Sequence, residues 1–211
     1  MKKTQYSLHH LRMMAPGITR IIAVMACLAG VAGCVSQMRA ESSRPVQCKP
    51  IEAFVQSNGL SYAAARLGVF YAREPDHAVG ISREVTSMYA DELVKNGVFS
   101  QVKLIPYTAR TAEEVIWWGR QEGCDLVMES EIVYLLTGSG TMPTKLGMRV
   151  RIIDTRTGGT LWDLQQWAFS EPGRDMDLFW HTVSGQSAQR HGALAKALAE
   201  QLPRYLATGK N

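Results

Sequence analysis

The sequence contains few of the residue arrangements that usually carry catalysis. Ser139 and Ser184 lie beside glycines, but neither stands in the Gly-x-Ser-x-Gly elbow of hydrolases, and the glycines around Ser139 lack the lysine of a phosphate-binding loop. After residue 33 the chain has three histidines, His77, His181 and His191, and no two of them have the spacing of metal ligands. These gaps predict a protein without enzymatic activity, resident metal or cofactor.

Acidic residues are absent from residues 1–33, which carry four basic residues. The apolar run from Ile21 to Cys34 is short: as a helix, its first dozen residues would span about 18 Å, against about 30 Å for the hydrocarbon core of a bilayer. A basic start, a short apolar run and small residues at its end are typical of a secretory signal peptide. We therefore expect residues 1–33 to be a cleaved leader and not a membrane span.

Cys34 ends this run in the stretch Val31-Ala32-Gly33-Cys34. The stretch resembles the lipobox of bacterial lipoproteins, in which the chain is cleaved before a lipidated cysteine, although valine stands where leucine is commoner. The resemblance implies diacylglycerol and palmitate chains on Cys34, which anchor a soluble domain to a bilayer. Val35 follows the cysteine, and by the enterobacterial pattern a residue other than aspartate there implies the outer membrane. The alternative is an ordinary secretory peptide that ends in cysteine.

Net charge is also lacking beyond the leader. Four of the 23 basic residues lie in residues 1–33, which leaves 19 basic residues against 19 acidic residues. A nucleic-acid-binding domain usually carries a basic excess. We therefore expect no nucleic-acid partner.

Cysteine is scarce: two of the four cysteines, Cys48 and Cys124, remain after the leader and the lipid site are set aside. In the oxidising compartment of an exported protein two thiols can form a disulfide, which contributes about 4 kcal/mol for a loop of this length in the chain-entropy model. The alternative is two separate thiols, with Cys124 buried as a small apolar residue. Their spacing does not decide between these alternatives.

Residues 34–59 are predicted to form the lipidated cysteine and a polar tether, with a short helix at Pro50–Val55. Residues 60–211 are predicted to form one α/β domain, because the apolar residues there alternate between the periods of strands and helices. The expected elements are strand Ala65–Arg73, helix Ile81–Asn96, strand Val102–Ile105, helix Ala112–Gly123, strands Asp125–Leu136, Met148–Ile153 and Thr160–Phe169, and helix Leu194–Leu206. This order, β-α-β-α-β-β-β-α, predicts a mixed sheet with two parallel crossovers and a meander.

Charges alternate along two of these strands, with Glu129 and Glu131 on one and Arg149 and Arg151 on the other. The two strands are joined by a short loop, so we expect them to pair as a hairpin. The four charges are then predicted to form cross-strand pairs on one face of the sheet.

Three stretches resemble a known group of proteins: Leu93–Phe99 at a helix end, Gly119–Val127 at a helix-to-strand step, and the hairpin Ile152–Trp162 with its Asp and Thr-Gly turn. The group comprises periplasmic domains of the TolB amino-terminal type, including the curli-secretion lipoprotein and lipoprotein activators of penicillin-binding proteins. The auxiliary lipoproteins of lipid-transporting ABC systems are similar in outline. The resemblance implies binding and assembly in the cell envelope without catalysis, and insertions in this chain are too short for additional membrane strands.

Trp117, Trp118 and Trp180 are the candidate partner contacts. Trp117 and Trp118 are neighbours on one predicted helix and cannot share a face, and the helical angle places Trp117 away from the packing side, so we expect it to be the more exposed. Trp180 lies in a predicted loop or early helix. The alternatives are that these rings are core residues, or that the chain from Val35 to Gly59 folds back over Trp117.

These observations predict an outer-membrane-anchored periplasmic lipoprotein that binds or scaffolds other envelope components, with envelope proteins as partners and self-association left open. The alternative is a carrier or auxiliary lipoprotein that binds a lipid or glycan for envelope transport. An apolar cavity would favour the carrier, whereas a flat aromatic patch would favour the protein-binding module.

Overall fold

The computed structural model describes residues 45–57, 62–76, 80–138, 142–173, 176–178, 181–183 and 185–208. The predicted leader, Cys34 and Trp180 lie outside the described residues, as do Ser139, Ser184 and His77. Among the described residues, no helix has both the length and the apolar character needed to cross a bilayer.

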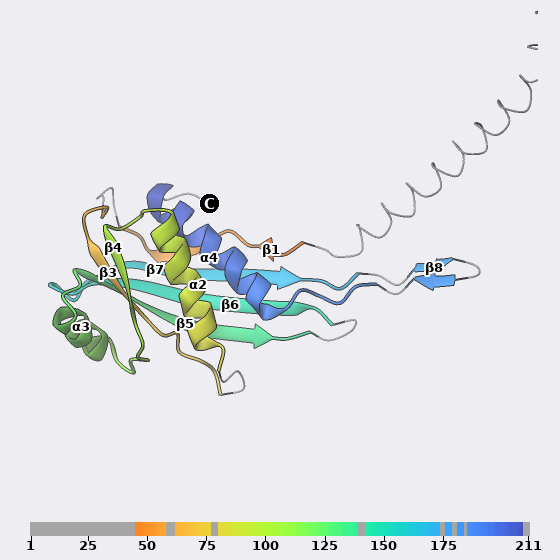
Figure 1. The fold of residues 1–211 in the computed structure, drawn as a ribbon, viewed down its shortest axis with the longest axis horizontal. Coiled ribbons are helices and arrows are strands. Elements are labelled where there is room, and N and C mark those ends of the chain that lie inside the picture. The colour runs from red at the N-terminus through yellow and green to blue at the C-terminus, as the bar shows by residue number, and fades with distance from the viewer. Residues whose placement is uncertain are drawn as a thin grey trace, which may run out of the picture. The chain divides into compact units, whose positions relative to one another are not determined.

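A seven-stranded sheet is the centre of the fold (Figure 1). Its strands are β1 (Gln47–Cys48), β2 (Glu52–Val55), β3 (Arg66–Phe70), β4 (Gln101–Ile105), β5 (Leu126–Leu136), β6 (Thr144–Asp154) and β7 (Thr160–Ser170). The order across the sheet is β1-β7-β6-β5-β3-β4, and β2 also pairs with β7. A separate two-stranded sheet is formed by β8 (Met176–Leu178) and β9 (His181–Val183).

The sheet is mixed, as the sequence predicted. β3 pairs in parallel with β4 and with β5, and the helices α2 (Ser82–Lys95) and α3 (Ala112–Gln121) make the two crossovers. β5, β6 and β7 then form an antiparallel meander of long strands. The helix α4 (His191–Thr208) closes the chain, so the predicted α/β class and element order are confirmed for this part of the fold.

The two faces of the sheet are covered unequally. On one face, α2 and α4 pack side by side (Figure 1), with α4 over β6 and β7 and α2 over β3 and β4, and they bury the larger core. That core is held together by a buried polar link: the Tyr89 hydroxyl donates to Gln166 Oε1 at 3.0 Å, and Gln166 Nε2 donates to the Leu198 carbonyl at 3.0 Å. Burial raises the pKa of Tyr89, so its hydroxyl remains a hydrogen-bond donor.

On the opposite face, α3 covers a smaller core centred on Phe70, Val115 and Val127. The rest of this face, formed by β5, β6 and β7, carries polar and aromatic side chains. We call it the open face and define it by the cross-strand rows Glu129–Arg151–Asp163 and Glu131–Arg149–Gln165, followed by the pair Gly147–Trp167.

The predicted helix at Pro50–Val55 is wrong, because Glu52–Val55 is the strand β2. Its backbone and that of β1 pair antiparallel with the edge of β7, so this part of the predicted tether belongs to the sheet. A helix of so few residues is marginal in water, whereas a strand at an available edge gains hydrogen bonds at once. Ile51, between the two strands, is buried in the larger core.

A β-bulge interrupts the alternation of side chains along β5. The register shifts between Ile132 and Tyr134, so that Tyr134 lies opposite Gly147 and Leu135 lies opposite Leu146. Strict alternation along the strand would place Tyr134 on the face of Met128 and Ile132, but the extra residue turns it to the open face. Leu135 instead packs against the larger core.

The predicted charge pairing is confirmed by the register. Glu129 lies opposite Arg151 and Glu131 lies opposite Arg149. Arg151 contacts the Glu129 carboxylate directly. Arg149 binds Asp163 through two hydrogen bonds of 2.9 and 2.7 Å, while Glu131 pairs with Arg73 at 3.1 Å, so the charges form a network across more strands than the hairpin predicts.

The disulfide between Cys48 and Cys124 is not formed, and both residues are free thiols. Cys48 lies on β1 and Cys124 lies two residues before β5, with β7 and β6 between the two strands. Three strand spacings amount to about 14 Å, whereas the Cα atoms of a disulfide lie within about 7 Å. Cys124 is buried in the smaller core, which agrees with the alternative of two separate thiols.

Candidate functional site

An aromatic surface lies on α3, and we define it by Trp117, Trp118 and Tyr107. The rings of Trp117 and Trp118 meet edge to face with centroids 4.8 Å apart, and Trp118 lies 5.6 Å from the ring of Tyr107. Trp118 packs partly against the smaller core, while Trp117 is 54% exposed. The expectation that Trp117 is the more exposed ring is confirmed.

α3 presents these rings from a fixed position. Gly119 faces β5 so closely that an added Cβ would lie 2.3 Å from Val127 Cγ1 and 2.9 Å from Thr155 Cγ2. Arg120 Nε also donates to the Thr155 carbonyl at 2.7 Å. Close packing and a hydrogen bond to the turn after β6 therefore limit rotation of the helix about its axis.

Two side chains, Thr111 and Glu114, cap the start of α3. Thr111 Oγ1 accepts the Glu114 N–H at 3.3 Å, and the Glu114 carboxylate accepts from the Arg110 N–H at 2.8 Å and from the Tyr107 hydroxyl. The Tyr107 hydrogen bond, followed by the Arg110 N–H, lowers the pKa of Glu114. The same bond raises the pKa of Tyr107, so the third ring of the aromatic surface is tied to the helix start.

The described part of the chain before β3 does not cover Trp117. Residues 47–48 and 52–55 pair with β7, which β6 and β5 separate from the β3 and β4 side of the sheet. Over the described residues the Trp117 ring keeps more than half of its surface in solvent. Among the described residues, the segment before β3 therefore does not fold back over Trp117.

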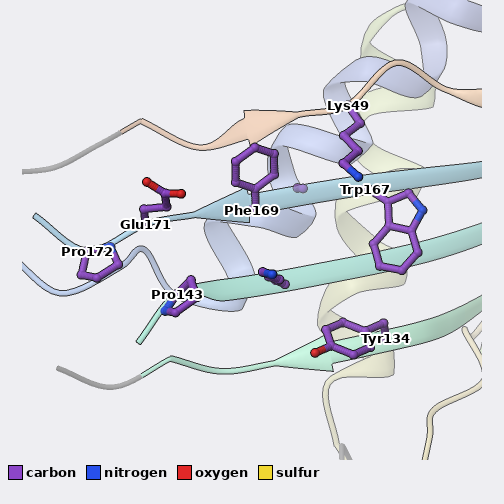
Figure 2. Close-up of a pocket in the computed structure, with 9 residues that line it drawn as sticks. Lys49, Tyr134, Pro143, Trp167, Phe169, Glu171 and Pro172 are labelled. Carbon is purple, nitrogen blue, oxygen red and sulfur yellow. The ribbon is translucent and has the colours of Figure 1, made fainter. Parts of the chain in front are cut away.

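A second surface is a groove on the open face with a volume of about 700 Å³ (Figure 2). Its lining side chains include Lys49, Tyr134, Lys145, Trp167, Phe169 and Glu171. Figure 2 shows Lys49, Trp167 and Tyr134 at one end, Phe169 and Pro143 between, and Glu171 and Pro172 at the other end. The volume lies within the range of ligand pockets, roughly 300–1,000 Å³.

The floor of the groove is an indole that rests on the sheet. Gly147 lies directly opposite Trp167, and a Cβ on Gly147 would be 2.7 Å from Cζ3 of the ring. The Tyr134 ring lies beside the indole with centroids 6.0 Å apart. Because position 147 has no side chain, the bulky ring of Trp167 lies close against the backbone and forms a low aromatic surface between the strands.

The other predicted sites fall in different places. Cys48 is exposed on β1 and Cys124 is buried. Desolvation of the sulfur is the main cause that raises the pKa of both thiols. His191 is the first residue of α4, and its Nε2 atom lies 4.0 Å from Oε2 of Glu84 on α2. No group of three or more His, Cys, Asp or Glu side chains in the described ranges is arranged to hold a metal ion.

Comparison with known proteins places the fold among solved structures. No family model matches the chain, and no curated protein sequence matches it. The PelC dodecamer from Paraburkholderia phytofirmans is similar with a TM-score of 0.54 and 14% identity, over 76% of this chain and 96% of PelC. A PelC variant from the same organism has a TM-score of 0.51 and 14% identity, over 78% of this chain and 97% of the variant.

A further similar structure is the LpoB C-terminal domain from Salmonella enterica, with a TM-score of 0.39 and 17% identity over 53% of this chain and 86% of that domain. At these identities the likeness concerns the fold. The resemblance that the sequence predicted is confirmed for the fold alone.

The groove was not predicted from the sequence. Its aromatic floor comes from Tyr134 on β5 and Trp167 on β7, and the bulge that turns Tyr134 to this face has no clear sequence signal. One signal was present: a glycine in the middle of a strand, Gly147, indicates a close approach by another group. That the approaching group is the Trp167 ring could not be predicted without the register of β6 and β7.

Proposed function

We propose that this chain is a bacterial lipoprotein, anchored in the outer membrane through Cys34, whose periplasmic domain binds or scaffolds other envelope components without catalysis. The lipobox-like stretch before Cys34 supports the anchor. The fold that the chain shares with the PelC dodecamer supports a role in assembly. PelC is a dodecamer, and self-association of this chain is part of the proposal.

The observation that carries the proposal is the exposure of Trp117. A tryptophan that is 54% exposed, in contact with a second tryptophan and fixed on a rigid helix, is the residue type most enriched at the energetic centre of protein interfaces. We propose that an envelope protein covers the aromatic surface of α3. Trp180 remains a proposed contact from the sequence.

A carrier for a lipid or glycan is the second candidate function, and the groove on the open face bears on it. The groove is open to solvent along the sheet, and two lysines lie on its rim. These features suit a polar ligand better than an acyl chain, which favours enclosed apolar cavities.

Two variants test the proposal. Cys34→Ala is expected to remain soluble or uncleaved, because the lipid supplies the anchor. Complete outer-membrane partition of a processed Cys34→Ala protein would contradict the anchor.

For docking, we compare crosslinking pull-downs of the lipidated wild type and of Trp117→Ala. We expect the variant to fold normally and to lose its partner. The matched control is Val94→Ala, which truncates another exposed apolar side chain, 59% exposed on α2. A large fall in melting temperature of Trp117→Ala would show instead that the ring is part of the core.

A further inference from the structure

We propose that the groove on the open face binds an acidic glycan, a sugar chain that carries carboxylate groups. The proposal concerns the face formed by β5, β6 and β7 and does not depend on docking at Trp117. It rests on two features of the groove: an aromatic floor and a cationic rim.

The aromatic floor suits a sugar ring. The indole of Trp167 lies on the backbone at Gly147, half-buried, and Tyr134 beside it is 42% exposed. The C–H groups on one face of a pyranose pack against the negative face of an aromatic ring, while the hydroxyl groups at its edge stay in water. Two adjacent rings that form a low surface offer places for more than one sugar unit.

The cationic rim selects the charge of the ligand. Lys49 and Lys145 both line the groove and both are exposed. Neither ammonium group has a hydrogen-bond or ion-pair partner among the residues that the structure describes. A carboxylate on a ligand would therefore gain charge-assisted hydrogen bonds here without displacing an internal partner.

The neighbouring charges of the open face are already paired. Arg149 is held by Asp163, Arg151 by Glu129 and Arg73 by Glu131, so these arginines are neutralised within the domain. Glu171 is the acidic residue of the groove lining, and it lies with Pro172 at the end away from Trp167 (Figure 2). The favourable position for a ligand carboxylate is consequently the end formed by Lys49, Trp167 and Tyr134.

The experiment is isothermal titration of the full chain, processed and held in detergent, with three probes. The first is an oligogalacturonate, the second a neutral maltooligosaccharide of the same length, and the third a polyglutamate of matched charge. We expect the oligogalacturonate to bind at least about tenfold more tightly than either control, since it alone combines sugar faces with carboxylates.

Variants then locate the site. Lys49→Ala combined with Lys145→Ala is expected to weaken oligogalacturonate binding by about tenfold or more, the loss expected for charge-assisted hydrogen bonds. Tyr134→Ala removes a partly exposed ring and is expected to weaken binding severalfold without unfolding the chain. Lys196→Ala, which removes an exposed lysine of α4 on the other face, is the matched control and should leave binding unchanged.

Three outcomes would overturn the proposal. One is the absence of oligogalacturonate binding to a folded chain. Another is polyglutamate binding as tight as that of the sugar, which would indicate a ligand recognised by charge alone, such as an acidic peptide. The third is oligogalacturonate binding that the double lysine variant and Tyr134→Ala leave unchanged, because the sugar would then lie elsewhere.

Discussion

Trp167 and Gly147 are direct cross-strand partners, and the indole occupies the space that a side chain at position 147 would need. The indole of Trp167 therefore covers the backbone at position 147 and lies close to the sheet. The shape of the groove therefore depends on the absence of a side chain at position 147 as much as on the indole of Trp167.

Gly147→Ala is expected to destabilise the protein by about 1–3 kcal/mol, the usual cost of overpacking, because the new methyl group displaces the ring. Urea unfolding measures the change. Gly192→Ala is the control: its Cβ would meet the flexible end of Glu84 at 3.0 Å, so it should be nearly neutral. Equal stability of wild type and Gly147→Ala would contradict the close contact.

The Glu129–Arg151 pair makes a second prediction. The Glu129 side chain is 8% exposed and that of Arg151 is 30% exposed. Arg151→Met is expected to cost about 2–4 kcal/mol, because it leaves a largely buried carboxylate without its direct partner. The double variant with Glu129→Gln should recover a large part of this loss in urea unfolding. Additive losses in the double variant would show that the two side chains are not coupled.

The pH dependence of stability should reflect Asp125. Hydrogen bonds from the Arg66 side chain and backbone lower the pKa of Asp125 in the folded chain. A lowered folded pKa means that the contribution is complete above the unfolded value and is lost as pH falls through the folded value. Because both side chains are about half exposed, we expect Asp125→Asn to cost only about 0.5–1 kcal/mol at neutral pH.

Unfolding titrations of wild type and Asp125→Asn from pH 7 to about pH 2 check this contribution, and the two stabilities should converge as the carboxylate is protonated. Asp91→Asn, an exposed carboxylate on α2, serves as the control with no expected effect. A stability difference that grows as pH falls would give the opposite sign and contradict the account.

The two free thiols make a chemical prediction. Under denaturing conditions without reductant, an alkylating reagent is expected to modify both Cys48 and Cys124, as read by mass spectrometry. In the folded chain Cys48 should react first, because it is exposed and Cys124 is buried. Desolvation of each sulfur raises both pKa values, so both reactions are slow. A mass two hydrogens lower, with neither thiol modified, would indicate the disulfide.

Much of the fold could be predicted from local patterns. The helix face of Val85, Tyr89 and Leu93 and the glycine after Asn96 correctly place α2 and its end, because helix packing imposes a fixed period on apolar residues. The pairing of Glu129 with Arg151 was also predictable, because hairpin strands that are neighbours in sequence are usually neighbours in space.

The errors come from partners that lie far away in sequence. Glu52–Val55 is a strand because β7 offers an edge more than one hundred residues later, and nothing in the four residues themselves excludes a helix. Tyr134 changes face because of one bulged residue. The groove unites side chains from three strands, whereas the exposure of Trp117 depends on a single helix and could be predicted.

The central claim is that a partner covers Trp117, and site-specific photocrosslinking in intact cells tests it most directly. A photoreactive phenylalanine derivative replaces Trp117 in one strain and Val94 in another, both positions being more than half exposed on helices. The account predicts a crosslinked species of higher mass at position 117 and none at position 94. Equal expression with no crosslinked species at position 117, or the same species at both positions, would contradict it.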